Sequence, residues 1–213
     1  MLKVQTFAVN FIDVNCYIIS DETNEAVIVD CGAYADEEKA AISNYISQYG
    51  LKICHLLCTH GHFDHIFGNQ FICDTYGIHP KLHIDDTETY YNAEIQMQMF
   101  LHRSFPLQIP SVEHFLKDGD CIKFGNHSIR VISTPGHTPG GVCYYIESEY
   151  LLLSGDSLFQ GSIGRCDLPG GNETSLKSNL RHKILTLPRN TRVLPGHGPS
   201  TTIDEEIRTN PFF

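Results

Sequence analysis

The chain has 213 residues, with 15 lysine and arginine residues against 25 aspartate and glutamate residues and a formal net charge of -10. This balance argues against a nucleic-acid partner, which requires a basic surface, and no apolar stretch approaches the roughly 20 residues of a membrane span. A hydrophobic fraction of 41% with 19% charged residues is typical of a folded globular protein, and the length suits a single domain over residues 1–213.

The first half of the chain alternates short strands with helices. Alternating or continuous apolar residues predict the strands, and helical spacing that ends at a glycine predicts the helices. In chain order we expect strands over 2–9, 15–20 and 26–30, a helix over 35–49, a strand over 53–58, and helices over 66–76 and 87–102.

The second half is richer in strands. We expect strands over 120–124, 127–133, 142–147 and 150–153, a glycine-rich loop over 159–172, a helix over 174–186 and a short strand over 192–194. Strands in both halves, with helices between them, predict two sheets that pack face to face with helices outside.

The eight cysteines form no C-x-x-C pair and lie mostly among apolar neighbours. A chain of this length does not need disulfides, so we expect reduced cysteines that pack as small apolar side chains. The first seven residues alternate as a strand does and lack the charged and apolar regions of a signal peptide. We therefore expect a cytoplasmic protein.

A histidine-rich loop follows the strand expected over 53–58. It reads Thr59-His60-Gly61-His62-Phe63-Asp64-His65. Neutral imidazole and carboxylate groups together are ligands of zinc and other borderline divalent ions. His60 and His62 can project to one side of an extended loop, while Asp64 and His65 can turn toward a second position. Each residue alone fits an ordinary polar loop, but the set favours a metal site.

Three later apolar runs, like the run before the histidine-rich loop, are each followed by a glycine-containing turn. Each of these turns carries one histidine or aspartate. These turns carry His137, Asp156 and His197. Polar groups on turns at the ends of rigid strands are a common way to assemble a site. We therefore expect the three side chains to lie on a common rim with the histidine-rich loop.

This ordered set resembles the pattern of the metallo-β-lactamase superfamily, H-x-H-x-D-H followed by a distant His, Asp and His. The resemblance extends from Val14 to His197. It implies an α/β fold, the αββα sandwich, in which two mixed β-sheets lie face to face with helices outside and the site at one edge.

The resemblance also implies two divalent metal ions and a role for each ligand. The first ion would be held by His60, His62 and His137, the second by Asp64, His65 and His197, with Asp156 between the two. Asp30 matches an aspartate that supports the ligand loop in this family, and a plain strand-ending aspartate is the equal alternative.

The segment over 155–167 is similar to the glyoxalase II (hydroxyacylglutathione hydrolase) branch, especially to its short single-domain bacterial members. Arg165 falls where that branch has a lysine that grips the substrate, so we expect it to bind a substrate carboxylate. An Arg165–Asp167 surface pair is the alternative. The helix over 87–102 is expected to act partly as a lid, with Met97 and Phe100 in the core.

The resemblance implies a dinuclear metal-dependent hydrolase of a thioester, either acylated glutathione or another anionic acyl-thiol. In this hypothesis a hydroxide shared by two ions attacks the carbonyl, and Asp64 is both a ligand and the group that orients the hydroxide. Zinc is the expected metal, with iron and manganese as alternatives.

Other activities remain open at this point. Asp156 disfavours β-lactam hydrolysis, because the antibiotic-hydrolysing enzymes lack this bridging aspartate. A mononuclear iron persulfide dioxygenase is the first alternative, since such enzymes share a Gly-Arg-x-Asp pattern like the one at residues 164–167. A non-catalytic metal-binding or regulatory module is the alternative from another class.

Overall fold

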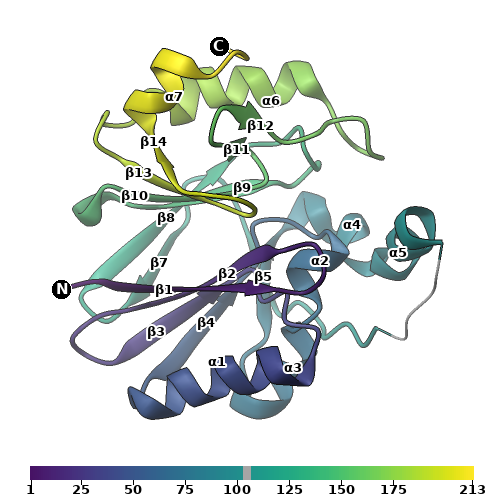
Figure 1. Cartoon of the computed structure of the whole chain (residues 1–213), viewed down its shortest axis with the longest axis vertical. Helices are drawn as coiled ribbons and strands as arrows, with labels where there is room; N and C mark the ends of the chain where they lie inside the picture. The colour runs from purple at the N-terminus through teal and green to yellow at the C-terminus, as the bar shows by residue number, and fades with distance from the viewer. Residues whose placement is uncertain (103–106) are drawn as a thin grey trace.

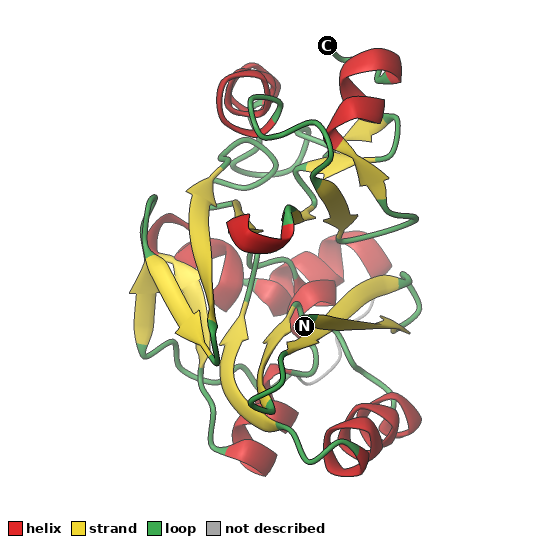
Figure 2. Ribbon diagram, turned by 90° about the vertical axis from the view of Figure 1, so that its left-hand side faces the viewer, coloured by secondary structure: helices red, strands yellow, loops and turns green. Residues whose placement is uncertain are grey.

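The computed structural model describes residues 1–102 and 107–213. Two mixed β-sheets of six strands each lie face to face, and helices cover both outer surfaces (Figure 1). Figure 2 shows the same layers from the side, with the strands between the outer helices. This arrangement is the αββα sandwich that the sequence predicts.

The first sheet comes from the N-terminal half of the chain, in the order β1-β2-β3-β4-β5-β6. Its strands are β1 (Lys3–Val9), β2 (Val14–Ser20), β3 (Glu25–Val29), β4 (Lys52–Leu57), β5 (Pro80–His83) and β6 (His114–Leu116). The first three strands are antiparallel and the last four are parallel. Parallel neighbours require crossover connections, and helices supply them here. These helices are α1 (Asp36–Gln48), α2 (Phe63–Ile66), α3 (Asn69–Tyr76), a 3-10 turn (Ile84–Asp86), α4 (Thr87–Tyr91) and α5 (Ala93–Leu101).

The second sheet comes from the C-terminal half, in the order β14-β13-β10-β9-β8-β7. Its strands are β7 (Cys121–Phe124), β8 (His127–Ser133), β9 (Val142–Ile146), β10 (Leu151–Gly155), β13 (Arg192–Pro195) and β14 (Thr201–Thr202). A small hairpin, β11 (Leu158–Phe159) with β12 (Ser162–Ile163), follows β10. The other elements are a 3-10 turn (Glu147–Glu149), α6 (Glu173–Asn179), its π-helical continuation (Leu180–Ile184) and α7 (Ile203–Thr209).

The main core lies between the two sheets. Side chains of both inner faces meet there, among them Val29 and Leu57 of the first sheet and Tyr144 and Leu153 of the second. Separate apolar clusters fill the space beneath the helices on each outer face. Because both faces of the central strands are covered, β9 is buried at every position and reads as a continuous apolar run.

Most elements agree with the sequence expectation to within two residues, and β8 has the expected bounds. The helix expected over 87–102 is interrupted at Asn92 and forms α4 and α5. The strands β5, β6, β11, β12 and β14 were not expected, because segments of two to four residues carry little periodicity. The hairpin of β11 and β12 includes the start of the loop expected over 159–172. Helix α7 was also missed, although Thr202 and Glu205 form a T-x-x-E start signal and the Thr202 hydroxyl accepts a hydrogen bond from the Glu205 amide.

All eight cysteines are free, as expected, and four of them are fully buried. Cys121 differs from the expectation, because it lies exposed on the edge strand β7. Across residues 1–102 and 107–213, no helix combines the length and the apolar character needed to cross a lipid bilayer.

Candidate metal centre

The structure brings the seven candidate ligands together at one edge of the sandwich, where strands of both sheets end. Each is carried by the loop or helix that follows a strand. His60 and His62 follow β4, Asp64 and His65 lie in α2, His137 follows β8, Asp156 follows β10 and His197 follows β13. The first four therefore come from the first sheet and the other three from the second.

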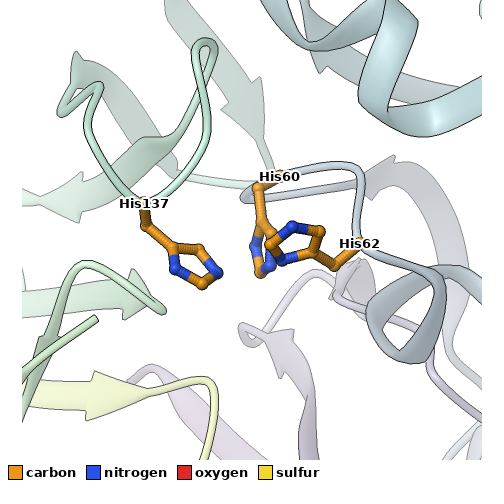
Figure 3. Close-up of side chains that lie close together, drawn as sticks. All are labelled: His60, His62 and His137. Atoms are coloured by element: carbon orange, nitrogen blue, oxygen red, sulfur yellow. The ribbon is translucent and has the colours of Figure 1, made fainter. Parts of the chain in front are cut away.

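His60, His62 and His137 form the first group (Figure 3). Their ring centroids lie 4.8 Å apart for His60 and His62, 4.9 Å for His60 and His137, and 4.6 Å for His62 and His137. The Nε2 atoms of His60 and His137 are buried and have no hydrogen-bond partner. Buried polar atoms are normally satisfied, so these nitrogens fit a site for a cation.

Asp64, His65 and His197 form the second group. The His197 Nε2 atom lies 3.3 Å from Asp64 Oδ2 and 3.3 Å from His65 Nε2. The His65 Nε2 atom lies 3.6 Å from Asp64 Oδ2. Two imidazoles and a carboxylate facing one point are a donor set suited to a divalent metal ion.

Asp156 lies between the two groups. Its Oδ1 atom is 3.4 Å from His65 Nε2, and its Oδ2 atom is 3.6 Å from both His137 Nε2 and His197 Nε2. Like the two imidazole nitrogens, Asp156 Oδ1 is buried without a hydrogen-bond partner. The carboxylate therefore has oxygen atoms within 3.6 Å of a histidine of each group.

The ring nitrogens that face away from the centre contact groups that orient the rings. His137 Nδ1 is 2.7 Å from the Arg165 carbonyl oxygen, and His197 Nδ1 is 3.1 Å from the Ile12 carbonyl oxygen. His60 Nδ1 is 3.0 Å from the Thr59 hydroxyl. Such contacts determine which nitrogen is available to a metal. The sequence predicted none of these three contacts. Two of the partners are backbone carbonyl oxygens far away in the chain.

Asp30 supports the ligand loop from beneath. Its carboxylate accepts hydrogen bonds from the Thr59 amide and the Thr59 hydroxyl, both at 2.7 Å, and its Oδ2 atom lies 3.1 Å from His65 Nδ1. Asp30 is buried with φ 53°, a left-handed conformation that costs free energy in a non-glycine residue. Asp30 therefore contacts both the ligand loop, at Thr59, and the candidate ligand His65.

Asp86 is a further site residue, which sequence reasoning did not find. Its fully buried carboxylate accepts hydrogen bonds from the Gly61 amide at 2.6 Å and from the Gly140 amide at 2.9 Å. Gly61 lies between two candidate ligands, and Gly140 lies in the turn that carries His137. Asp86 thus joins two ligand loops, and no local pattern in the sequence marks it.

The protonation states also suit metal binding. Burial lowers the pKa of His60 and lowers the pKa of His62 to about 3, so both rings are neutral and able to bind a metal. For His65, burial opposes protonation, but the Asp156, Asp64 and Asp30 carboxylates outweigh it and raise the pKa. A metal cation would take the place of this proton.

A cavity of about 310 Å³ opens beside the centre. Arg165 lines it, with its Nε and Nη2 atoms 2.8 and 2.7 Å from the two Asp167 carboxylate oxygens. The Arg165–Asp167 surface pair is therefore present, and Arg165 is the member of the pair that lines the cavity.

The expectation that Met97 and Phe100 both lie in the core is wrong for Phe100. Phe100 is 39% exposed and lines the cavity. Met97 is buried as expected. Tyr90 is also buried, with its hydroxyl donating to the Pro110 carbonyl.

The family model of the metallo-beta-lactamase superfamily matches residues 9–197 of the chain. The chain is 36% identical to "Probable metallo-hydrolase YqgX" of Bacillus subtilis, over 99% of this chain and 97% of that protein. It is 31% identical to "Hydroxyacylglutathione hydrolase GloC" of Haemophilus influenzae, over 99% of this chain and 98% of that protein.

Two solved structures are similar over nearly their whole lengths. BLEG-1, described as a B3 metallo-beta-lactamase, is 37% identical with a TM-score of 0.88, over 100% of this chain and 99% of that one. TTHA1623, solved in a di-iron-bound form, is 33% identical with a TM-score of 0.86, over 99% of this chain and 100% of that one.

Proposed function

This chain belongs to the metallo-β-lactamase superfamily, and from that premise we propose that it is a dinuclear metal-dependent hydrolase of the glyoxalase II-like type that cleaves a thioester. The observation that carries the proposal is the pair of ligand groups with the Asp156 carboxylate between them. The similarity to a hydroxyacylglutathione hydrolase supports the thioester as substrate.

The proposed cofactor is a pair of divalent ions, one held by each group. We propose zinc, because imidazole and carboxylate donors suit it. Iron is the alternative, supported by the di-iron form of TTHA1623. When bound, such a pair supplies a water of lowered pKa and polarises a carbonyl oxygen.

The remaining steps belong to residues of the chain. Asp64 faces the same space as His197 and is proposed to orient the attacking water by accepting its hydrogen bond. Arg165, which lines the cavity, is proposed to bind an anionic group of the substrate. Hydrolysis breaks the carbon–sulfur bond, adds water across it and releases a carboxylic acid and a thiol.

No cysteine is needed as a nucleophile in this proposal. Thiolates and not thiols are nucleophilic, so a thiol with a raised pKa is poorly suited to such a role. Burial raises the pKa of Cys143 to about 11, so this side chain stays protonated near neutral pH.

A second candidate is hydrolysis of a β-lactam ring. It is supported by the 37% identity to BLEG-1, which is described as a B3 metallo-beta-lactamase. Asp156 disfavoured this activity in the sequence analysis, so a chromogenic cephalosporin belongs in the same assay panel as the thioesters.

The test replaces one ligand of the first group and the bridging residue, in the variants His62→Ala and Asp156→Ala. We expect metal content to fall and thioester turnover to drop by about a hundredfold or more, since even partners of metal ligands contribute 10–100-fold. Element-resolved metal analysis and turnover of acylated glutathione are the measurements. His114→Ala is the matched control, because His114 is exposed on β6 outside the centre.

Three results would contradict the proposal. Full turnover in either variant would exclude the ligand assignment. One iron per chain with oxygen consumption on a persulfide would indicate a dioxygenase. A metal-loaded protein without activity on thioesters, β-lactams or persulfides would indicate a binding or regulatory module.

A further inference from the structure

We call the cavity beside the metal centre the metal-side cavity. A second cavity adjoins it at α4 and α5, which project from the right-hand side of the molecule in Figure 1. We call it the α5 groove. Its volume is about 330 Å³, within the range of small-molecule sites. It shares the lining residues His62, Phe100 and Leu168 with the metal-side cavity, so the two cavities adjoin each other.

The walls of the α5 groove are largely apolar. Ile95 and Met99 of α5 are each 57% exposed, and Phe100 is 39% exposed. Pro139 and Leu168 face them from the side of the second sheet. Large apolar side chains exposed side by side next to a polar reaction centre are a feature of ligand sites rather than of ordinary surface.

The two cavities differ in their cationic groups. None of the described residues that line the α5 groove is a lysine or an arginine, and two of them, Asp85 and Glu88, carry carboxylates. The metal-side cavity is also lined by carboxylates, Asp64 and Asp156, but these are candidate metal ligands, and Arg165 lines the same cavity while paired with Asp167. A negative group would therefore be repelled in the groove, whereas cations bound at the metal centre would attract it.

We propose that the α5 groove binds an uncharged alkyl group of the thioester substrate, while any anionic group points toward Arg165 and the metal centre. This inference rests on the proposed function and adds a substrate class to it, an amphiphilic thioester with one apolar arm. The shared chemistry is an alkyl chain, which either the acyl part or the thiol part can carry.

The first test measures binding without turnover. Metal-loaded protein is titrated calorimetrically with non-hydrolysable S-ethyl, S-butyl and S-hexyl thioethers of N-acetylcysteamine, a neutral thiol. We expect affinity to rise about fourfold per added methylene until the groove is filled. A carboxylate at the end of the hexyl chain should lower affinity by at least about threefold. Affinity independent of chain length, or improved by the carboxylate, overturns the inference.

Two variants on the same helix localise the effect. Met99→Glu places a charge in the groove and should remove the dependence on chain length. Gln98→Glu adds the same charge at an exposed position that does not line the groove, and it should retain the dependence. An equal loss in both variants, or in neither, overturns the assignment of the groove.

Turnover then separates this inference from the proposed function. Two series of thioesters, one lengthened in the acyl part and one in the thiol part, are compared by kcat/KM. The series whose kcat/KM rises identifies the arm that enters the groove. If binding depends on chain length but no thioester is hydrolysed, the groove assignment stands and the proposed thioesterase activity is wrong. If thioesters are hydrolysed but neither affinity nor kcat/KM changes with chain length, the thioesterase activity stands and the groove assignment is wrong.

Discussion

Asp86 is the residue whose role depends most on its tertiary contacts. Its carboxylate accepts hydrogen bonds from the backbone amides of Gly61 and Gly140. These two glycines lie in ligand-carrying loops that follow strands of different sheets. A Cβ atom on Gly61 would lie 2.6 Å from the Tyr90 backbone nitrogen, so the loop packs directly against α4 and has no room for a side chain there. Burial raises the pKa of Asp86, although the Gly140 and Gly61 amides oppose the shift.

The variant Asp86→Asn should therefore weaken metal binding without unfolding the protein. An amide offers one acceptor oxygen, so one of the two glycine amides loses its partner. We expect metal affinity to fall by about 10–100-fold, measured by competition with a chromogenic chelator, and kcat to fall more than KM rises. Asp36→Asn is the control, because the Asp36 side chain is 98% exposed. Unchanged affinity in Asp86→Asn would show that Asp86 only fills space.

At the scale of elements, a second aspartate links the two sheets away from the metal centre. Asp21, in the turn between β2 and β3, is buried and accepts hydrogen bonds from Thr23 and from the Asn126 amide in the turn between β7 and β8. Its Oδ2 atom also lies 3.1 Å from His127 Nδ1. One carboxylate therefore joins a hairpin of each sheet.

Because of this contact, we expect the free energy of unfolding to decrease in acid. Burial alone would raise the pKa of Asp21, but hydrogen bonds from Thr23 and Asn126 outweigh it, and the pKa lies well below its usual range. A carboxyl with a lowered folded-state pKa stabilises the fold above its unfolded pKa, and this contribution is lost as pH falls through the folded pKa.

The variant Asp21→Asn should reduce the free energy of unfolding near neutral pH by about 1–3 kcal/mol, because buried donors lose a charged acceptor. It should also flatten the fall in stability below about pH 4. Urea unfolding at several pH values measures both effects, with Asp36→Asn as the reference. An equally steep acid dependence in Asp21→Asn would assign the effect to other carboxyls.

For the whole molecule, the important feature is that the metal ligands come from both sheets. Four lie between β4 and the end of α2, and His137, Asp156 and His197 follow strands of the second sheet. Metal ions in this centre would tie the two halves of the sandwich together at one edge. Ligand binding to the folded state alone stabilises that state by mass action.

Removing the metal should therefore lower the thermal stability. At a free metal concentration a thousand times the Kd, the expected stabilisation is about 4 kcal/mol. For a chain of this length that corresponds to a Tm difference of roughly 8–16 °C. Calorimetry of metal-loaded and chelator-treated protein measures the difference, which Asp156→Ala should reduce strongly. Equal Tm values for the two forms would show that the centre does not connect the sheets.

The sequence by itself predicted the longer strands, the layered fold and the seven candidate ligands. It could do so because the evidence is local, in apolar runs of strand length and in turns that place His or Asp directly after them. His60, His62 and His137 converge because strand ends of both sheets meet at one edge. That consequence follows from the fold class.

Only the tertiary structure decided which groups support and surround the centre. Asp86 and the carbonyl oxygens of Arg165 and Ile12 act across long sequence separations. Nothing near them in the chain marks a role, because a hydrogen bond depends on where two segments meet. Exposure is decided in the same way. Met97 is buried and Phe100 faces the cavity, although both are large apolar residues of one helix. Packing against the rest of the molecule, not residue type, determines which side chain the substrate can reach.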